Sequence, residues 1–461
     1  MSPMRLFLRC LCISGLILGL SACVTNSILV PYTAKAQNLR NALNSGAVAA
    51  EKKTLTEAAD GQDKILYLME LGRLNLLTQN PKDSLQNFSE VTQRWDELRL
   101  RARISLSHTA SEGASLLTND NALPYEGRPF EKIFLHEYQA LNYLATGKPT
   151  DALVEVRNAE FEQRQVLLAN DSKVYAATRS AQQQGFNPNA YTNADFFSGM
   201  NAAAGRVKNA FQNAYAFYIS ALIYEAAGQL NDAYIDDKKA LEIWPDNPTV
   251  RRDVLRIGTL SGMSEVAQAA KAVPHLLPPP LSGSLVVLYE QGWVPVKQNL
   301  RFPIVTSSTT NYLAVPIYSG PFLLPQPLNY LIDQQPATTS PLVDVVALAT
   351  FDLKQQLPGI LARQWLRLLT KQKMQRELNK NAGDLGSLFG VLLTAVTDQA
   401  DVRSWSSLPA NAQTDRVWLA PGAHSVVIDG HTIPVNIQTG HTTILLVSEA
   451  GQMLSLNTYA L

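Results

Sequence analysis

Histidine side chains are the groups of this chain best suited to act as acids, bases or metal ligands. The six are His108, His136, His275, His424, His431 and His441. His431 and His441 lack the i, i+4 spacing of helical metal ligands, so a zinc site is not expected. His424 stands beside Ser425, but neighbours in a strand point to opposite faces and cannot form a base and nucleophile pair.

Other catalytic signatures are missing from the sequence as well. It contains no G-x-S-x-G nucleophile elbow, no G-x-x-x-x-G-K phosphate loop and no H-E-x-x-H zinc motif. Asp236 and Asp237 fall on a predicted helix, where solvated charges are commoner than a catalytic pair. We therefore expect no enzymatic activity, no metal and no catalytic cofactor. The alternative is an enzyme site assembled from Glu, Asp and Tyr side chains at a domain boundary.

A signal for thiol modification surrounds Cys23. Two arginines precede an apolar run at residues 11–20, which ends in small residues. These parts are typical of a secretory signal peptide, and the run is too short for a permanent membrane helix of ~20 residues. The stretch Leu20-Ser21-Ala22-Cys23 resembles a bacterial lipobox, in which Cys23 is acylated after removal of residues 1–22. The alternatives are an ordinary signal peptide with an incidental cysteine, or a retained anchor helix.

The chain left by this cleavage is nearly neutral and has a single cysteine. Removal of residues 1–22 takes away Arg5 and Arg9 but no acidic residue, leaving 37 basic against 39 acidic side chains. This balance argues against nucleic acid as a partner. Val24 follows the cysteine, where an inner-membrane retention signal typically has Asp. We therefore expect a lipoprotein with covalent acyl chains such as palmitate, attached to the periplasmic face of the outer membrane.

Helical periodicity dominates residues 23–272 and shows a tetratricopeptide-like repeat. Small residues let paired helices approach, a glycine turn joins them, and large apolar residues fill the seam. The clearest copy has Phe217, Ala221, Tyr224, Gly228, Ala233, Ala240 and Pro245 in one register. Earlier copies are predicted at about 65–96 and 133–165. The polar tract 170–206 interrupts the repeats, and the sequence leaves open whether it carries function or is disordered.

Repeats of this kind stack into a solenoid whose inner helices line a concave binding groove. By register, the inner helices fall at about 133–145 and 215–227. They present side chains suited to an extended peptide or a helix, namely Phe134, Glu137, Leu141, Tyr215, Tyr218 and Glu225. The alternative is that the C-terminal half of the chain covers this groove.

The C-terminal half is predicted to be a β-rich domain, residues 284–461. Prolines at 273–283 predict a linker before it, because proline cannot continue a helix. A pair of helices at about 350–400 is inserted, followed by a terminal β-module at about 412–461. The hairpin turn Asp429-Gly430 supports this module, which is weakly similar to PEGA-type β-modules. The predicted fold class is α+β and multidomain.

The first of the inserted helices, at about 350–379, is amphipathic. Its polar face carries Lys354, Arg363, Arg367, Lys371, Lys373 and Arg376. A basic amphipathic helix can lie on a membrane surface or bind an acidic partner. The alternative is a solvated face on a packed helix.

A cluster of Asp401, Arg403 and Trp405 lies between the inserted helices and the terminal module. Helix and strand periodicity do not explain it. One interpretation is a structural corner held by an Asp–Arg pair with Trp405 buried. The other is a partner-binding hot spot at Arg403 and Trp405.

Four stretches together resemble an uncharacterised family of tetratricopeptide-containing lipoproteins of Gram-negative bacteria. They are Val154-Glu-Val-Arg157-Asn-Ala159, Tyr224-Glu-Ala-Ala-Gly228-x-x-Asn231-Asp-Ala-Tyr-Ile235, Val287-Leu-Tyr-Glu-Gln-Gly292 and Asp401-x-Arg-Ser-Trp-x-x-Leu-Pro409. The resemblance implies work in envelope assembly alongside other lipoproteins, including activators of peptidoglycan synthases. It supplies no catalytic residues.

The expected function is that of a lipid-anchored periplasmic scaffold or adaptor. Its partner would be an envelope protein, such as another lipoprotein or a peptidoglycan synthase. The alternative function is regulation of an enzyme that makes or remodels peptidoglycan, or direct binding to peptidoglycan.

Overall fold

The computed structural model of the chain describes residues 32–105, 120–168, 172–305, 310–397 and 399–461. Cys23 and the predicted signal peptide 1–22 lie outside these ranges, so lipid attachment stays a prediction. Within the described ranges, no helix has the length and apolar character that crossing a bilayer requires.

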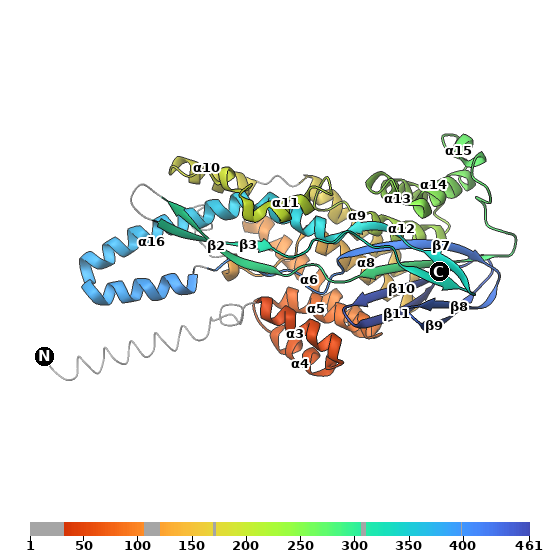
Figure 1. Cartoon of the computed structure of the whole chain (residues 1–461), viewed down its shortest axis with the longest axis horizontal. Helices are drawn as coiled ribbons and strands as arrows, with labels where there is room; N and C mark the ends of the chain where they lie inside the picture. The colour runs from red at the N-terminus through yellow and green to blue at the C-terminus, as the bar shows by residue number, and fades with distance from the viewer. Residues whose placement is uncertain (1–31, 106–119, 169–171, 306–309, 398) are drawn as a thin grey trace.

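Antiparallel helical pairs build the N-terminal part of the fold (Figure 1). Gly147 and Gly228 follow two of the helices at the same point of the turn, and each has a φ of +72°, which glycine adopts without strain. The helices are α3 (Tyr32–Ser45), α4 (Val48–Ala58), α5 (Lys64–Leu77), α6 (Pro81–Ser105), α8 (Pro129–Ala145), α9 (Pro149–Leu168), α12 (Ala214–Ala226), α13 (Leu230–Ile243), α14 (Pro248–Leu260) and α15 (Ala267–Lys271), with a 3-10 turn η1 (Asp120–Ala122).

The described part of the polar tract 170–206 is mostly helical. It contains α10 (Ser172–Gln183), η2 (Pro188–Tyr191), η3 (Asp195–Phe197) and α11 (Ser198–Ala204). These elements pack along α16 (Val345–Thr397). Phe186, for example, stacks on Trp365 with 4.8 Å between the ring centroids.

Two sheets form a sandwich in the C-terminal half. The first has the strand order β11-β10-β1-β7-β6 and the second the order β5-β4-β8-β9. The strands are β1 (Gly283–Gln291), β4 (Asn329–Ile332), β5 (Gln335–Thr338), β6 (Ser340–Asp344), β7 (Asn411–Leu419), β8 (Gly422–Ile428), β9 (His431–Ile437), β10 (Thr442–Ala450) and β11 (Met453–Ala460). The mixed α+β class is therefore confirmed, whereas assignment of the helices to a tetratricopeptide solenoid stays a prediction.

Strand β1 lies at the centre of the first sheet, parallel to β10 and antiparallel to β7. Leu285 and Val287 point to the second sheet and share its core. Val286 and Leu288 point to the opposite face and belong to the core that contains the helices. Because successive side chains of a strand alternate between faces, burial of both faces explains the unbroken apolar run of β1.

A two-stranded ribbon and the long helix α16 extend beyond the rest of the molecule (Figure 1). The ribbon pairs β2 (Lys297–Val305) with β3 (Thr310–Tyr318). The prediction of a pair of helices at about 350–400 is corrected, because the structure has one helix there, α16, of 53 residues. Glycines in the 380s lower helix propensity by about 1 kcal/mol each without ending the helix. The ribbon of α16 nevertheless bends and turns back in Figure 1.

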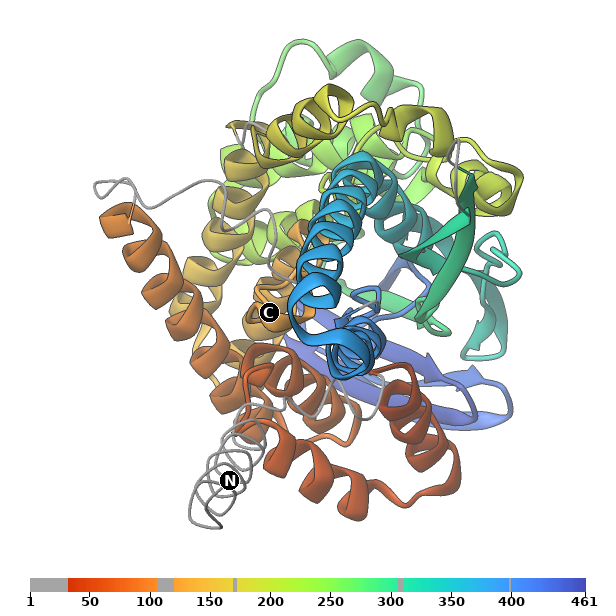
Figure 2. The ribbon, with the colours of Figure 1, turned by 90° about the vertical axis from the view of Figure 1, so that its left-hand side faces the viewer.

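One hydrophobic core runs through both halves of the chain. It contains Leu66 and Tyr138 from the helices together with Val286, Leu446 and Trp405 from the C-terminal half. Figure 2 shows the helical pairs as an arc around α16 and the sheets. Residues 272–282, which contain no helix or strand, connect α15 to β1.

Candidate functional site

The side chains predicted to line a concave binding groove are covered by the chain itself. Five of them are completely buried, with 0 % of each residue exposed: Phe134, Glu137, Leu141, Tyr215 and Tyr218. Tyr215 and Tyr138 point their hydroxyl groups at Glu290 of β1, from 3.5 and 2.9 Å. The expectation of an open groove on α8 and α12 is therefore corrected, because the first sheet fills it.

A buried ion pair lies where the helices meet this sheet. The Arg73 guanidinium of α5 is 2.5 Å from the Glu290 carboxylate, and both side chains are at most 2 % exposed. The Ser448 hydroxyl of β10 donates to the same carboxylate at 2.7 Å. Arg73 also lies 4.5 Å above the Tyr138 ring. Nη1 of Arg73 is buried without a hydrogen-bond partner among the described residues. The pair joins α5 to β1, and either partner alone would be a costly buried charge.

Glu225, also predicted to contact a partner, is held inside the chain by two arginines. Arg256 of α14 contacts it at 2.6 Å and Arg416 of β7 at 2.9 Å. Burial alone would raise the pKa of the Glu225 carboxyl, but the two guanidinium groups outweigh burial and lower the pKa to about 2. Glu225 is therefore ionised at any physiological pH and joins α12 to the sheet.

The Asp401, Arg403 and Trp405 cluster forms a structural corner. Arg403 contacts Asp401 at 2.8 Å and also pairs with Asp63, which precedes α5. Trp405 is 0 % exposed, and its ring meets those of Phe88 and Tyr138 edge-on. The expectation that Arg403 and Trp405 bind a partner is corrected, because both side chains are used internally.

Two buried carboxylates that the sequence analysis missed hold this corner. The Trp405 backbone N–H donates to Glu131 of α8 at 2.7 Å, and the next N–H, of Ser406, donates to Glu70 of α5 at 2.7 Å. Glu131 stands in the first turn of α8, where a glutamate commonly caps the helix, whereas Glu70 interrupts the apolar segment 65–71 of α5. A lone acid within an apolar stretch was the available signal, since a buried carboxylate requires donors from elsewhere.

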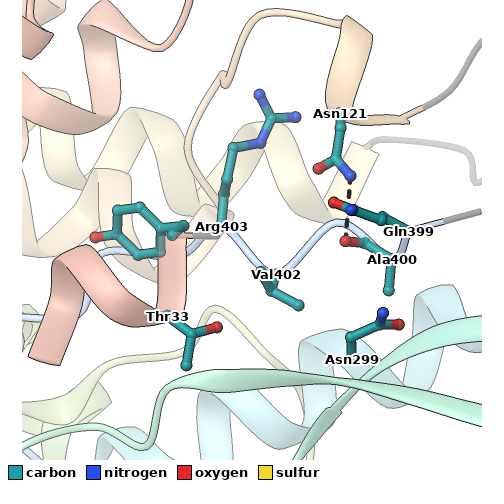
Figure 3. Close-up of a pocket in the computed structure, with 8 residues that line it drawn as sticks. Thr33, Asn121, Asn299, Gln399, Ala400, Val402 and Arg403 are labelled. Carbon is teal, nitrogen blue, oxygen red and sulfur yellow. Dashed lines mark hydrogen bonds between the residues drawn. The ribbon is translucent and has the colours of Figure 1, made fainter. Parts of the chain in front are cut away.

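A small cavity lies beside the same corner, at the start of α3 (Figure 3). Its volume is about 120 Å³. The Asn121 amide donates to the Ala400 carbonyl at 3.2 Å at its edge. It is lined by Tyr32, Thr33, Asn121, Asn299, Gln399, Ala400, Val402 and Arg403. The cavity therefore marks the place where α3, β2 and the segment after α16 meet.

A larger opening lies on the outer side of the helices, between α4 and α6 and above α5. We call it the α5 groove; its volume is about 320 Å³. Leu68, Leu71 and Asn75 line it from α5. Its other lining residues are Lys52, Thr56, Ala59, Asp60 and Lys64, and Asp83, Gln86, Asn87 and Glu90.

Polar groups in the α5 groove are only partly satisfied. The Asn75 amide nitrogen donates to Asn87 at 2.8 Å, whereas the buried Asn75 Oδ1 has no partner among the described residues. Two ion pairs, Lys52–Asp83 at 2.8 Å and Lys64–Glu90 at 2.6 Å, connect the helices around it. The groove thus combines an apolar floor, carboxamide groups and charges of both signs.

Among the described residues, no group of three His, Cys, Asp or Glu side chains is placed so that it could hold a metal ion. Comparisons of the chain with protein-family models, with curated proteins and with solved structures found no match.

Proposed function

We propose that this chain is a lipid-anchored adaptor of the periplasm, attached to the outer membrane through Cys23, which binds an envelope protein partner in the α5 groove. The observation that carries the proposal is the α5 groove itself. It opens on the outer side of the helices, whereas the inner side is filled by the chain's own sheet.

The chemistry of the groove suits an extended peptide segment. The unpartnered Asn75 Oδ1 can accept a backbone N–H after a small side-chain rotation, and Asn87 and Gln86 add further carboxamide groups. Leu68 and Leu71 supply an apolar floor for one aliphatic side chain. The walls of the groove carry two lysines and three acidic residues. This excess of negative charge favours a peptide segment that contains a basic residue.

The groove can be tested by filling it from an exposed position. Thr56 lines the groove and is exposed, so Thr56→Trp places an indole in it without disturbing the core. A photo-crosslinking residue at Gln86 should trap a discrete partner in cells, and Thr56→Trp should remove most of that product. Thr54→Trp, on an exposed position of α4 outside the groove, is the matched control and should leave it unchanged. Equal products from both variants would exclude the groove as the binding site.

Anchoring and the class of partner are tested separately. Cys23→Ala should move the protein out of the outer-membrane fraction, and unchanged co-sedimentation would show that the lipid is not the anchor. Purified protein should not enrich on bare peptidoglycan sacculi. Enrichment there would instead favour a direct peptidoglycan binder.

A further inference from the structure

The projecting end of the molecule consists of α16 and the tip of the β2–β3 ribbon. Figure 2 looks onto this end, with α16 nearest the viewer. The two elements support each other: the Gln372 amide of α16 donates to the Asn311 side chain of β3 at 3.0 Å. The two elements therefore contact each other at this end of the molecule.

Exposed basic side chains gather at this end. Lys373 and Arg376 of α16 and Arg301 of β2 are all exposed. No ion pair to any of the three is seen among the side chains that the structure describes. Tyr312, on β3 near the ribbon tip, is 56 % exposed. Arg301 and Tyr312 stand on one face of the ribbon, and Asn311, which contacts α16, stands on the other. The cations and the tyrosine therefore surround this end from two sides. Unpaired cations and an exposed tyrosine at one end of a molecule are features that bind a membrane interface, where tyrosine lies at headgroup level.

The predicted tether brings this end within reach of the membrane. Cys23 precedes Tyr32 by nine residues, which span about 30 Å when extended. Tyr32 lines the small cavity together with Ala400, just after α16. Residues 376–397 are helical, so at 1.5 Å per residue this part of α16 is at most about 32 Å long. The extended tether and residues 376–397 of α16 are therefore of similar length. Both extend from the region of the small cavity.

We propose that the projecting end rests on an anionic phospholipid surface, with Lys373, Arg376 and Arg301 on the headgroup phosphates and Tyr312 in the interface. This inference rests on the proposed anchor at Cys23, which fixes the membrane on the side from which the chain enters α3. The lipid then holds the protein, and the basic end sets its orientation.

The orientation can be measured with the full chain reconstituted into vesicles of phosphatidylethanolamine and phosphatidylglycerol. A photo-crosslinking residue, benzoylphenylalanine, replaces either Tyr312 or Leu281. Leu281 is 77 % exposed and belongs to the connection 272–282, which follows α15 and lies away from α16 in Figure 1. Lipid adducts, counted by mass spectrometry, should form at position 312 and be at least about tenfold fewer at position 281.

Charge variants separate headgroup binding from simple proximity. Lys373→Glu with Arg376→Glu should reduce the adduct at position 312 by about tenfold. Lys238→Glu with Lys271→Glu changes the net charge equally on α13 and α15 and should have no effect. Replacement of phosphatidylglycerol by phosphatidylcholine should reproduce the loss. If thermal melting shows that the glutamate variant is unfolded, the double variant Lys373→Gln with Arg376→Gln replaces it. This variant should reduce the lipid adduct at position 312 by about threefold.

Equal adducts at positions 312 and 281, or equal effects of the two charge pairs, would overturn the proposal. Failure of the anchor is distinguishable, because it appears in the fractionation of Cys23→Ala.

Discussion

At the scale of single residues, the buried carboxyl groups of Glu131 and Glu137 on α8 differ in their hydrogen bonding. Both are 0 % exposed. Glu131 accepts hydrogen bonds from the backbone N–H groups of Trp405 and Arg128 and from the Tyr125 hydroxyl. Glu137 has no hydrogen-bond partner for either oxygen among the described residues. Burial, with Asp236 and Glu155 nearby, raises the pKa of Glu137 well above its usual range.

We expect Glu137→Gln to stabilise the protein at alkaline pH. A carboxyl whose pKa is raised by folding binds more protons folded than unfolded, so stability falls as pH rises above its unfolded pKa of about 4.3. Glutamine mimics the protonated form and removes this loss. The free energy of unfolding should be unchanged at pH 4 and higher than wild type at pH 8 by about 1–3 kcal/mol, measured by urea denaturation.

Glu131→Gln is the matched control on the same helix. Its two oxygens accept three hydrogen bonds. Glutamine replaces one of these oxygens by an NH2 group that cannot accept, so at least one buried donor loses its partner. It should lower the free energy of unfolding at pH 8 by about 2 kcal/mol or more. Stabilisation by both variants, or by neither, would contradict the distinction between the two sites.

At the scale of elements, α5 is the helix on which the others depend. It is mostly apolar, and every residue except Lys64 is buried, including those that form the floor of the α5 groove. Outer helix α6 contacts it closely at Gly72, where a Cβ atom would overlap the Phe88 ring. Phe88 in turn supports Trp405. The approach of α6 to α5 therefore fixes the position of the buried corner.

We expect Gly72→Ala to destabilise the protein by about 1–3 kcal/mol, because Phe88 is enclosed and cannot move aside. The shift of the urea midpoint would measure the loss. In Gly61→Ala, the new Cβ would meet only the Ala58 carbonyl at 3.4 Å, so stability should change by less than about 1 kcal/mol. Partial recovery by Phe88→Leu in the Gly72→Ala background would identify the overlap as the cause.

Many of the helices and strands could be predicted from the periodicity of apolar residues in the sequence. The helical pair around Gly228 and the strand β1 follow from local spacing and from turn residues. The single helix α16 and the helical packing of 172–204 could not be predicted, because contacts with distant elements decide them. The same holds for the binding face: the position of Tyr215 on an inner face follows from its sequence, but the strand that covers it lies 75 residues away at Glu290.

At the scale of the whole molecule, the two halves share a core and buried charge pairs. Arg73 with Glu290 and Glu225 with Arg416 each join a helix to the first sheet. Neither half can be removed without leaving charges unpaired in the interior. The halves should therefore unfold together.

Cleavage of the connection between the halves tests this expectation. A protease site inserted between Pro280 and Leu281 lies in an exposed stretch without helix or strand. After cutting, both fragments should elute together in size-exclusion chromatography and unfold in one transition. Separation of the fragments, with one still folded, would contradict a shared core.

The pairing of β1 also determines when the fold can be completed. Ser284 pairs with Trp418 on one side and Thr442 on the other. The chain is synthesised from its N-terminus, so β1 is made before both of its neighbours, β7 and β10. Until these strands are available, no sheet can cover the inner face of the helices. Contacts this distant in sequence also fold slowly. Completion of the fold therefore waits for β10, which also contacts α3 near the opposite end of the described chain.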